Sequence, residues 1–87
     1  MNAAYRVLVS RRVRKQISRI DRSNQLRIRV ALDLLATEPR PPKCVALSGF
    51  ESTYRVRVGD YRILYSVHDE IRVIAVIRVG HRREVYR

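Results

Sequence analysis

The spacing of apolar residues changes midway along this chain, from the period of a helix to the period of a strand. In the first half, apolar residues recur every three or four positions, as in Val13, Ile17 and Ile20. From Tyr54 onward they alternate with polar residues, which is typical of strands with one buried face. Helices followed by strands favour an α+β domain in which the helices cover one face of a largely antiparallel sheet.

The first half predicts a short strand and two helices. Residues 5–9 alternate and are rich in β-formers, and Ser10 is a good N-cap for a helix that follows. Asp21 or Ser23 can cap a second helix, which the prolines after Glu38 stop. We expect this second helix to bury one continuous apolar stripe, made of Leu26, Val30, Ala31, Leu34 and Leu35.

The second half predicts a three-stranded antiparallel meander. Gly59 and Asp60 separate two alternating segments, and a two-residue loop with Gly first suits a type II′ hairpin turn. Residues 71–79 are strongly apolar, which predicts a central strand buried on both faces and ended by Gly80. The predicted order is β-α-α-β-β-β in one domain across residues 1–87. The first strand joins the same antiparallel or mixed sheet, and the two N-terminal helices lie on one face.

Charge restricts the partners of this chain. It has 19 Lys and Arg against 8 Asp and Glu, a net charge of +11, which favours nucleic acid, an acidic protein or an anionic membrane surface. A membrane is the weakest of these, because no apolar run approaches the ~20 residues that span a bilayer.

Cys44 is the only cysteine, so we expect no disulfide and a cytoplasmic protein.

The composition also excludes several kinds of catalysis. Cys and His residues show no metal-ligand spacing, so we expect no metal and no cofactor. The eight acidic residues are scattered, which argues against paired-carboxylate and two-metal hydrolysis. There is no Gly-rich phosphate loop and no Ser-His-Asp pattern.

Polar side chains with possible functions gather in the C-terminal half. Arg55 and Arg57 share one strand face, and pairing around the hairpin turn brings Arg62 close to Arg57. His81, Arg82 and Tyr86 follow the last strand, whose end could bring Arg82 to the same sheet face. The alternative for each is a solvated surface residue, because charged side chains are normally exposed.

These residues stand in motifs that resemble a known family. The RelE branch of the RelE/ParE toxins has a similar pattern of Gly-Asp-Tyr-Arg, Gly-His-Arg and a terminal Val-Tyr. Here the matching segments are residues 47–49, 54–65, 79–82 and 84–86, and the span that contains them is about half of the chain. The resemblance implies a RelE-like fold and a toxin that cleaves mRNA in the ribosomal A site.

The resemblance also implies a role for individual residues. Arg55 and Arg57 stand where the family has basic residues that hold the RNA backbone. Arg62 matches the arginine that contacts the scissile phosphate. Arg82 matches the arginine that is assigned to charge stabilisation or to protonation of the leaving group. Tyr86 matches a tyrosine that stacks on or orients the nucleotide.

Two departures from the family pattern affect the acid–base chemistry. Relatives commonly have Lys where this chain has Arg55 and Arg57, and arginine transfers protons poorly. Some relatives have a carboxylate in the loop that precedes residue 47, and residues 39–46 contain none. We therefore hypothesise that His81 or Tyr86 assists proton transfer, since His titrates near neutral pH.

The resemblance and the charge together indicate two partners. An antitoxin with an acidic segment would fold on the toxin surface, and the ribosome with mRNA in its A site would be the target. A basic helical face is a candidate surface for ribosomal RNA, with Arg11, Arg12, Arg14, Lys15 and Arg19 as its members. Two alternatives stay open: a ParE-like DNA gyrase inhibitor and a nucleic-acid-binding module without catalysis.

Overall fold

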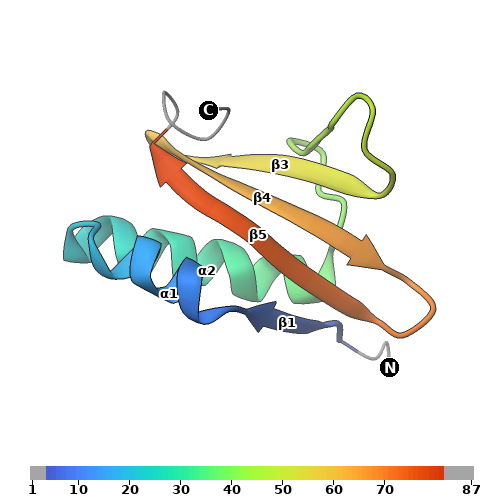
Figure 1. The fold of residues 1–87 in the computed structure, drawn as a ribbon, viewed down its shortest axis with the longest axis horizontal. Helices are drawn as coiled ribbons and strands as arrows, with labels where there is room; N and C mark the ends of the chain where they lie inside the picture. The colour runs from blue at the N-terminus through green and yellow to red at the C-terminus, as the bar shows by residue number, and fades with distance from the viewer. Residues whose placement is uncertain (1–3, 82–87) are drawn as a thin grey trace.

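The computed structural model describes residues 4–81, which form two helices on one face of a five-stranded sheet (Figure 1). The sheet order is β1-β5-β4-β3-β2, with β1 parallel to β5 and the other pairs antiparallel. The sheet is therefore mixed, and the predicted α+β fold class is confirmed. The elements are β1 (Arg6–Val9), α1 (Arg11–Ser18), α2 (Arg22–Thr37), β2 (Val45–Ala46), β3 (Thr53–Val58), β4 (Tyr61–His68) and β5 (Val73–His81).

Side-chain caps begin both helices where the sequence predicted. The Ser10 hydroxyl accepts a hydrogen bond from the Val13 amide at 3.2 Å. Asp21, rather than Ser23, caps α2, because its carboxylate accepts the Asn24 amide at 3.3 Å and the Ser23 hydroxyl at 2.8 Å. Each cap satisfies an amide that has no partner within the helix, which fixes where α1 and α2 begin.

Of the predicted stripe on α2, Leu35 is buried and Ala31 packs against the core, whereas the other three residues do not. Ile28, Leu32 and Leu35 pack into the core, although the first two were not in the expected stripe. Leu26, Val30 and Leu34 are instead exposed, by 54%, 57% and 63%. At 3.6 residues per turn the two sets lie on roughly opposite sides of the helix. Because α2 is apolar on both sides, periodicity alone does not determine which side meets the sheet.

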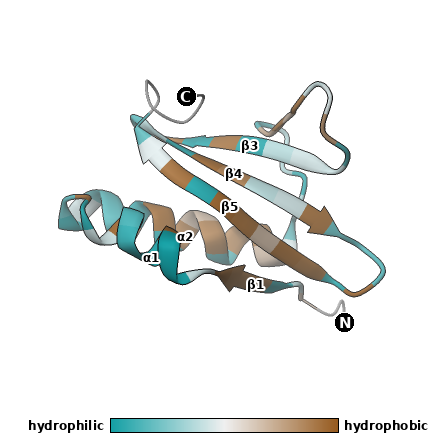
Figure 2. Cartoon of the chain, in the orientation of Figure 1, coloured by the Kyte–Doolittle hydropathy of each residue, from teal (hydrophilic) through white to brown (hydrophobic). Residues whose placement is uncertain are grey.

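The core lies between the helices and one face of the sheet. Figure 2 shows β5 as largely hydrophobic and α1 as largely hydrophilic, in agreement with the interior position of β5 in the sheet and the mostly exposed side chains of α1. The strand residues of the core all point toward the helices, and they alternate along each strand except at the end of β5. They are Val56, Ile63, Tyr65, Val67, Ile74, Val76 and Val79.

Strand β5 differs from the prediction in its burial and its ends. It lies between β1 and β4, as expected of the most apolar strand. Because the helices cover only one face of the sheet, Ile77 on the other face is 48% exposed, and burial on both faces was wrong. Ile71 belongs to the preceding turn, and pairing with β4 continues through Gly80 to His81 rather than stopping at Gly80.

A tight hairpin turn and a short additional strand complete the sheet. Val58 pairs with Tyr61 around the two-residue loop, and Gly59 has a φ of 60°. Asp60 is not in the left-handed region, so the loop has the backbone pattern of the predicted type II′ turn. The two-residue strand β2, which pairs with Tyr54 and Arg55 of β3, was not predicted, because two residues carry no periodic signal.

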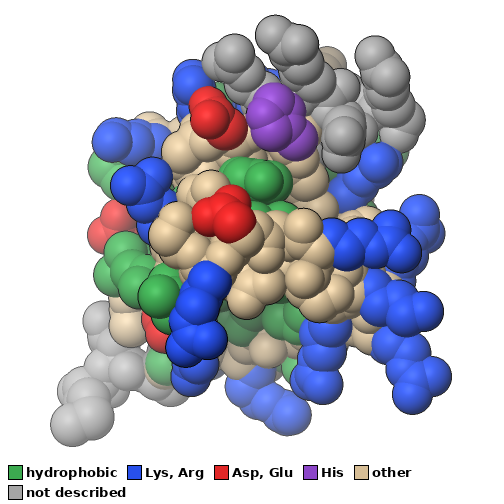
Figure 3. Space-filling view, turned by 90° about the vertical axis from the view of Figure 1, so that its left-hand side faces the viewer, with side chains coloured by type: hydrophobic (Ala, Val, Ile, Leu, Met, Phe, Trp, Pro, Cys, Tyr) green, Lys and Arg blue, Asp and Glu red, His purple; other side chains and the backbone are tan. Residues whose placement is uncertain are grey.

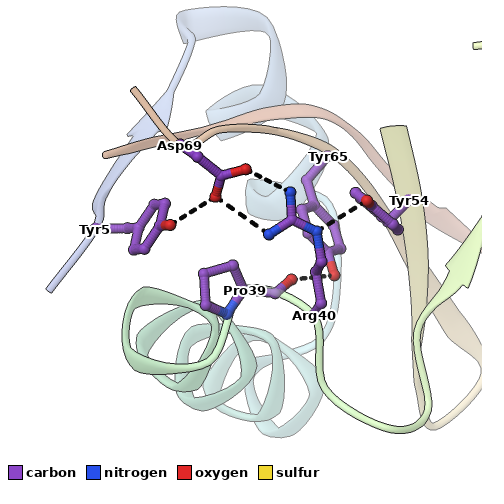
Figure 4. Close-up of polar contacts among 6 residues, drawn as sticks. All are labelled: Tyr5, Pro39, Arg40, Tyr54, Tyr65 and Asp69. Carbon is purple, nitrogen blue, oxygen red and sulfur yellow. Dashed lines mark hydrogen bonds and ion pairs between the residues drawn. The ribbon is translucent and has the colours of Figure 1, made fainter. Parts of the chain in front are cut away.

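A polar clasp closes the end of the sheet away from this hairpin (Figure 4). We use that name for Tyr5, Arg40, Tyr54 and Asp69. The Asp69 carboxylate accepts the Tyr5 hydroxyl at 2.6 Å and two Arg40 nitrogens at 2.7 and 3.1 Å. Arg40 also donates through Nε to the Tyr54 hydroxyl at 2.9 Å. The clasp therefore ties the N-terminal segment, the loop after α2, β3 and the β4–β5 turn together.

Replacing Asp69 by asparagine should reduce the loss of stability in acid. Hydrogen bonds from Arg40 and Tyr5 lower the pKa of Asp69 to about 2, below its ordinary value of 3.8. A lowered pKa stabilises the fold above pH 4, and that contribution disappears as the pH falls toward 2. Urea unfolding at a series of pH values should show a free energy of unfolding that falls less steeply for Asp69→Asn than for the wild type. Asp33→Asn is the control, since the Asp33 side chain is exposed and makes no hydrogen bond within residues 4–81. Equal slopes for Asp69→Asn and wild type would contradict the prediction.

Candidate nucleic-acid interface

The sheet face that the helices leave uncovered carries a group of arginines. On β3, Val56 points toward the helices, so Arg55 and Arg57 point to the opposite, open face. On β4, Ile63 and Tyr65 are buried under the helices, and Arg62 therefore lies on the open face as well. The predicted sharing of one face by Arg55, Arg57 and Arg62 follows from this alternation.

Strand register places these arginines in two neighbouring rows. Arg57 lies opposite Arg62, and Arg62 lies opposite Gly80. In the next row, Arg55 lies opposite Leu64, and Leu64 lies opposite Arg78. Side chains opposite one another on one face have Cβ atoms about 5 Å apart. We call Arg55, Arg57, Arg62 and Arg78 the arginine cluster.

A β-bulge brings Arg78 to this face. Leu64 pairs with Arg78 but Tyr65 pairs with Val76, so Ile77 is an extra residue in β5. Val76 and Val79 are consequently both buried although they are three residues apart. Strict alternation would place Arg78 under the helices, and Arg78 was not among the predicted site residues. The signal available was a charged residue at a position that alternation assigns to the core.

The strand register gives the immediate neighbours of the cluster. Gly80 has no side chain, so β5 places none opposite Arg62. Arg57 is exposed and donates through Nε to the Gly59 carbonyl at 3.1 Å, which holds its side chain beside the turn. Guanidinium groups bind phosphate oxygens in a bidentate manner, so adjacent arginines on a rigid sheet suit a polyphosphate backbone.

His81 lies at the same end of the sheet but on the other face. It is opposite Tyr61, and the two rings meet edge-on with centroids 5.7 Å apart. Since Tyr61 shares the helix-facing side with Ile63, the structure does not bring His81 into the arginine cluster. Its neighbour Val79 donates its amide to the Gln16 side chain at 2.9 Å, which binds this end of β5 to α1. Arg82 and Tyr86 lie outside residues 4–81.

A second basic surface lies on α1. The side chains of Arg11, Arg12, Arg14, Lys15 and Arg19 are all exposed, as predicted. Figure 3 shows Lys and Arg side chains crowded along one side of the molecule, with few acidic side chains between them. Within residues 4–81, no helix is both long enough and apolar enough to cross a membrane.

Comparisons with known proteins agree with one another on the kind of protein. The family described as "ParE toxin of type II toxin-antitoxin system, parDE" matches residues 7–86. The chain is 28% identical over 86 residues to the putative toxin RelE1 of Methanocaldococcus jannaschii, covering 95% of this chain and 96% of that protein.

Solved structures have the same fold. In the archaeal RelE–RelB complex from Pyrococcus horikoshii OT3, the matching chain is 30% identical, with a TM-score of 0.83 over 94% of this chain and 99% of that one. The isolated E. coli RelE toxin is 29% identical, with a TM-score of 0.80 over 95% of this chain and 92% of that one.

The fold and these similarities define a toxin of a type II toxin–antitoxin system. Within that class, the chain belongs to the RelE/ParE family, and its similar solved structures are RelE toxins.

Proposed function

We propose that this toxin inhibits translation as a ribosome-dependent endonuclease that cleaves mRNA in the A site. The observation that carries the proposal is the arginine cluster, which places four guanidinium groups in two adjacent rows of a rigid sheet. The relationship to RelE toxins supports the same reading. The basic α1 face supplies a separate surface for ribosomal RNA phosphates.

The proposed chemistry needs no metal, because RNA carries its own nucleophile. The ribose 2′-oxygen attacks the adjacent phosphorus while its proton passes to a base. The bond to the 5′-oxygen breaks, and that oxygen takes up a proton, leaving a 2′,3′-cyclic phosphate. Negative charge grows on the non-bridging oxygens, where one preorganised donor is typically worth about 3 kcal/mol.

We assign each arginine of the cluster a role that follows from its position in the sheet. Arg62 contacts the scissile phosphate, because it lies in the middle strand of the row, with Arg57 on one side and Gly80 on the other. Arg55 and Arg57 bind the neighbouring RNA backbone, and Arg78 on β5 binds it as well. We assign Arg82 to the charge on the leaving group, following the family pattern.

We assign proton transfer to Tyr86 or His81. Arginine remains protonated, so the arginine cluster supplies no base. His81 is on the helix-facing side and would reach a substrate only around the end of β5. Tyr86 is assigned from the family pattern, to orient the nucleotide and assist activation of the 2′-hydroxyl. Comparing cleavage by His81→Ala and Tyr86→Phe separates these roles, and full activity in both would remove the assignment.

The proposal includes an antitoxin and a cytoplasmic site of action. Related RelE toxins were solved in complex with RelB antitoxins. A net charge of +11 favours an acidic partner that neutralises this surface until the toxin is released.

Purified toxin added to translating ribosomes should produce new mRNA ends at A-site codons, mapped by primer extension. Free mRNA should remain largely intact, because the ribosome positions the substrate. A parallel assay of DNA supercoiling by gyrase tests the alternative of a ParE-like gyrase inhibitor. The match to the ParE family is the reason for including this assay. Gyrase inhibition without mRNA cleavage would favour that alternative, and neither effect would favour a binding module without catalysis.

A further inference from the structure

A cationic hollow lies between α1 and the last part of β5. Strand β1 pairs with β5 only as far as Val76, so within residues 4–81 no strand covers that edge of β5 beyond this residue. Helix α1 packs against β5 here, and the hollow between them has a volume of about 470 Å³. Its walls include Gln16, Arg19, Tyr61, Arg78, Gly80 and His81.

One hydrogen bond fixes the orientation of the Gln16 amide. The backbone N–H of the buried residue Val79 donates to Gln16 Oε1 at 2.9 Å. A backbone N–H can only donate, so turning the amide over would leave this buried donor without a partner. The Gln16 side chain makes no other hydrogen bond within residues 4–81, and its NH2 group is therefore the donor that it offers to a ligand.

The other walls of the hollow supply positive charge and aromatic rings. Arg19 is exposed at the end of α1 and carries a planar fork of N–H donors. Tyr61 and His81 are half-buried, and their rings meet edge-on with centroids 5.7 Å apart. None of the lining residues among 4–81 is acidic. Donors, positive charge and an aromatic wall together are the chemistry by which proteins bind an unstacked nucleobase.

The hollow adjoins the arginine cluster. Arg78 lines the hollow and also lies in the row that contains Arg55. Gly80 lines the hollow as well and lies opposite Arg62, which the proposed function places at the scissile phosphate. An RNA strand that is bound on the open face therefore reaches the hollow by crossing the uncovered edge of β5.

We propose that this hollow binds a guanine base of the mRNA, in the nucleotide next to the scissile phosphate. The inference rests on the proposed function and adds a specificity pocket to it. Guanine presents two acceptors, O6 and N7, on one edge, and arginine binds this pair in a bidentate manner. Arg19 makes that contact, Gln16 donates to O6 as well, and the base packs against the wall formed by Tyr61 and His81.

The other bases suit these donors less well. Glutamine binds adenine through its oxygen and nitrogen together, and the Gln16 oxygen already accepts the Val79 amide. Adenine and cytosine both place an amino donor where guanine has O6, so they would leave hydrogen bonds unmade. Uracil has a carbonyl O4 without a second acceptor beside it, so it does not engage both arms of the Arg19 guanidinium.

The binding test uses 2′-O-methyl hexanucleotides, which the toxin cannot cleave because the attacking oxygen is blocked. Each is an oligoadenylate in which one central position is guanine, adenine, uracil or 7-deazaguanine, so all carry the same charge. Fluorescence anisotropy at physiological ionic strength should show the guanine form bound about 10-fold more tightly than the adenine form. The 7-deazaguanine form lacks only the N7 acceptor and should lose most of this preference.

Three variants assign the preference to the hollow. Gln16→Glu keeps an oxygen for the Val79 amide but replaces the NH2 donor by an acceptor, so it should lose the preference for guanine. The matched control is Arg29→Gln, which also lowers the net charge by one and lies on α2 outside the hollow. It should weaken binding of all four forms equally and retain the preference. Arg19→Lys keeps the charge without the bidentate contact and should bind the guanine and 7-deazaguanine forms alike.

Three results would refute the guanine pocket. They are equal binding of the guanine and adenine forms by the wild type, the same preference in Gln16→Glu as in Arg29→Gln, and a uracil form bound as tightly as the guanine form. Circular dichroism of each variant establishes that the fold is retained.

Mapping of cut sites on ribosomes tests whether the base belongs to the mRNA. If it does, Gln16→Glu should shift cleavage away from sites beside a guanine, and an unchanged distribution would overturn the assignment to mRNA. Because the binding test needs no cleavage, the two proposals fail separately. A toxin that prefers the guanine form but cuts no mRNA would refute the nuclease and leave the pocket standing. Cleavage of mRNA without any preference among the hexanucleotides would refute the pocket alone.

Discussion

Replacing Arg62 by alanine should lower the rate of ribosome-dependent mRNA cleavage by about 100- to 1000-fold. Arg62 occupies the middle of the row formed by Arg57, Arg62 and Gly80, where a phosphate on the open face would be within reach of two guanidinium groups. The loss should appear in the rate at saturating ribosome concentration, because the guanidinium stabilises charge that develops only during the reaction. Single-turnover cleavage of mRNA on stalled ribosomes measures it.

Two further variants make this prediction specific. Arg62→Lys keeps the charge but loses the bidentate geometry, so it should recover only part of the rate. Arg29→Ala removes the same charge from an exposed position on α2 and should leave the rate at saturation nearly unchanged. An Arg62→Ala toxin as active as Arg29→Ala would contradict the assignment of the open face as the catalytic surface.

Replacing Ile63 by alanine should destabilise the domain by about 3 kcal/mol, which lowers the melting temperature by roughly 15 °C. Ile63 is fully buried on the helix-facing side of β4 and is paired with Val56 on one side and Val79 on the other. A chain of this size buries a modest core, so this one cavity removes a large part of a total stability of about 5–10 kcal/mol.

The matched control is Ile71→Ala, which makes the same change at a turn residue that is 68% exposed. It should change the free energy of unfolding by less than about 0.5 kcal/mol. Urea denaturation followed by circular dichroism compares the two variants directly. Similar losses in both would mean that the β4 core position is not as closely packed as its burial indicates.

The elements that were predicted correctly are those with strong local signals. Ser10 and Asp21 supply capping oxygens, and Gly59 supplies the left-handed residue of a two-residue turn. These features act over three or four residues and require no knowledge of the rest of the fold. The side of α2 that meets the core is a tertiary property, because Ile28 and Val30 are equally apolar and only packing on the sheet distinguishes them.

The same distinction applies to the candidate site. The proximity of Arg57 and Arg62 follows from the hairpin turn, which sets the register of β3 against β4. Arg78 depends on a bulge one strand further away, and its only sign in the sequence is a charged residue within an otherwise apolar strand. The convergence of Arg82 and Tyr86 with this cluster stays a prediction.

The parallel pairing of β1 with β5 has a consequence for how the toxin is made. Arg6 is hydrogen-bonded to the segment that begins β5, and Arg6 is in register with Val73, so the sheet gains its first strand only after its last one exists. Contacts between such distant parts of a chain form late in folding. During synthesis the helices leave the ribosome before β5 does, and until then Arg78 cannot stand beside Leu64. The arginine cluster is therefore assembled only after β5 has emerged, later than α1, α2, β3 and β4.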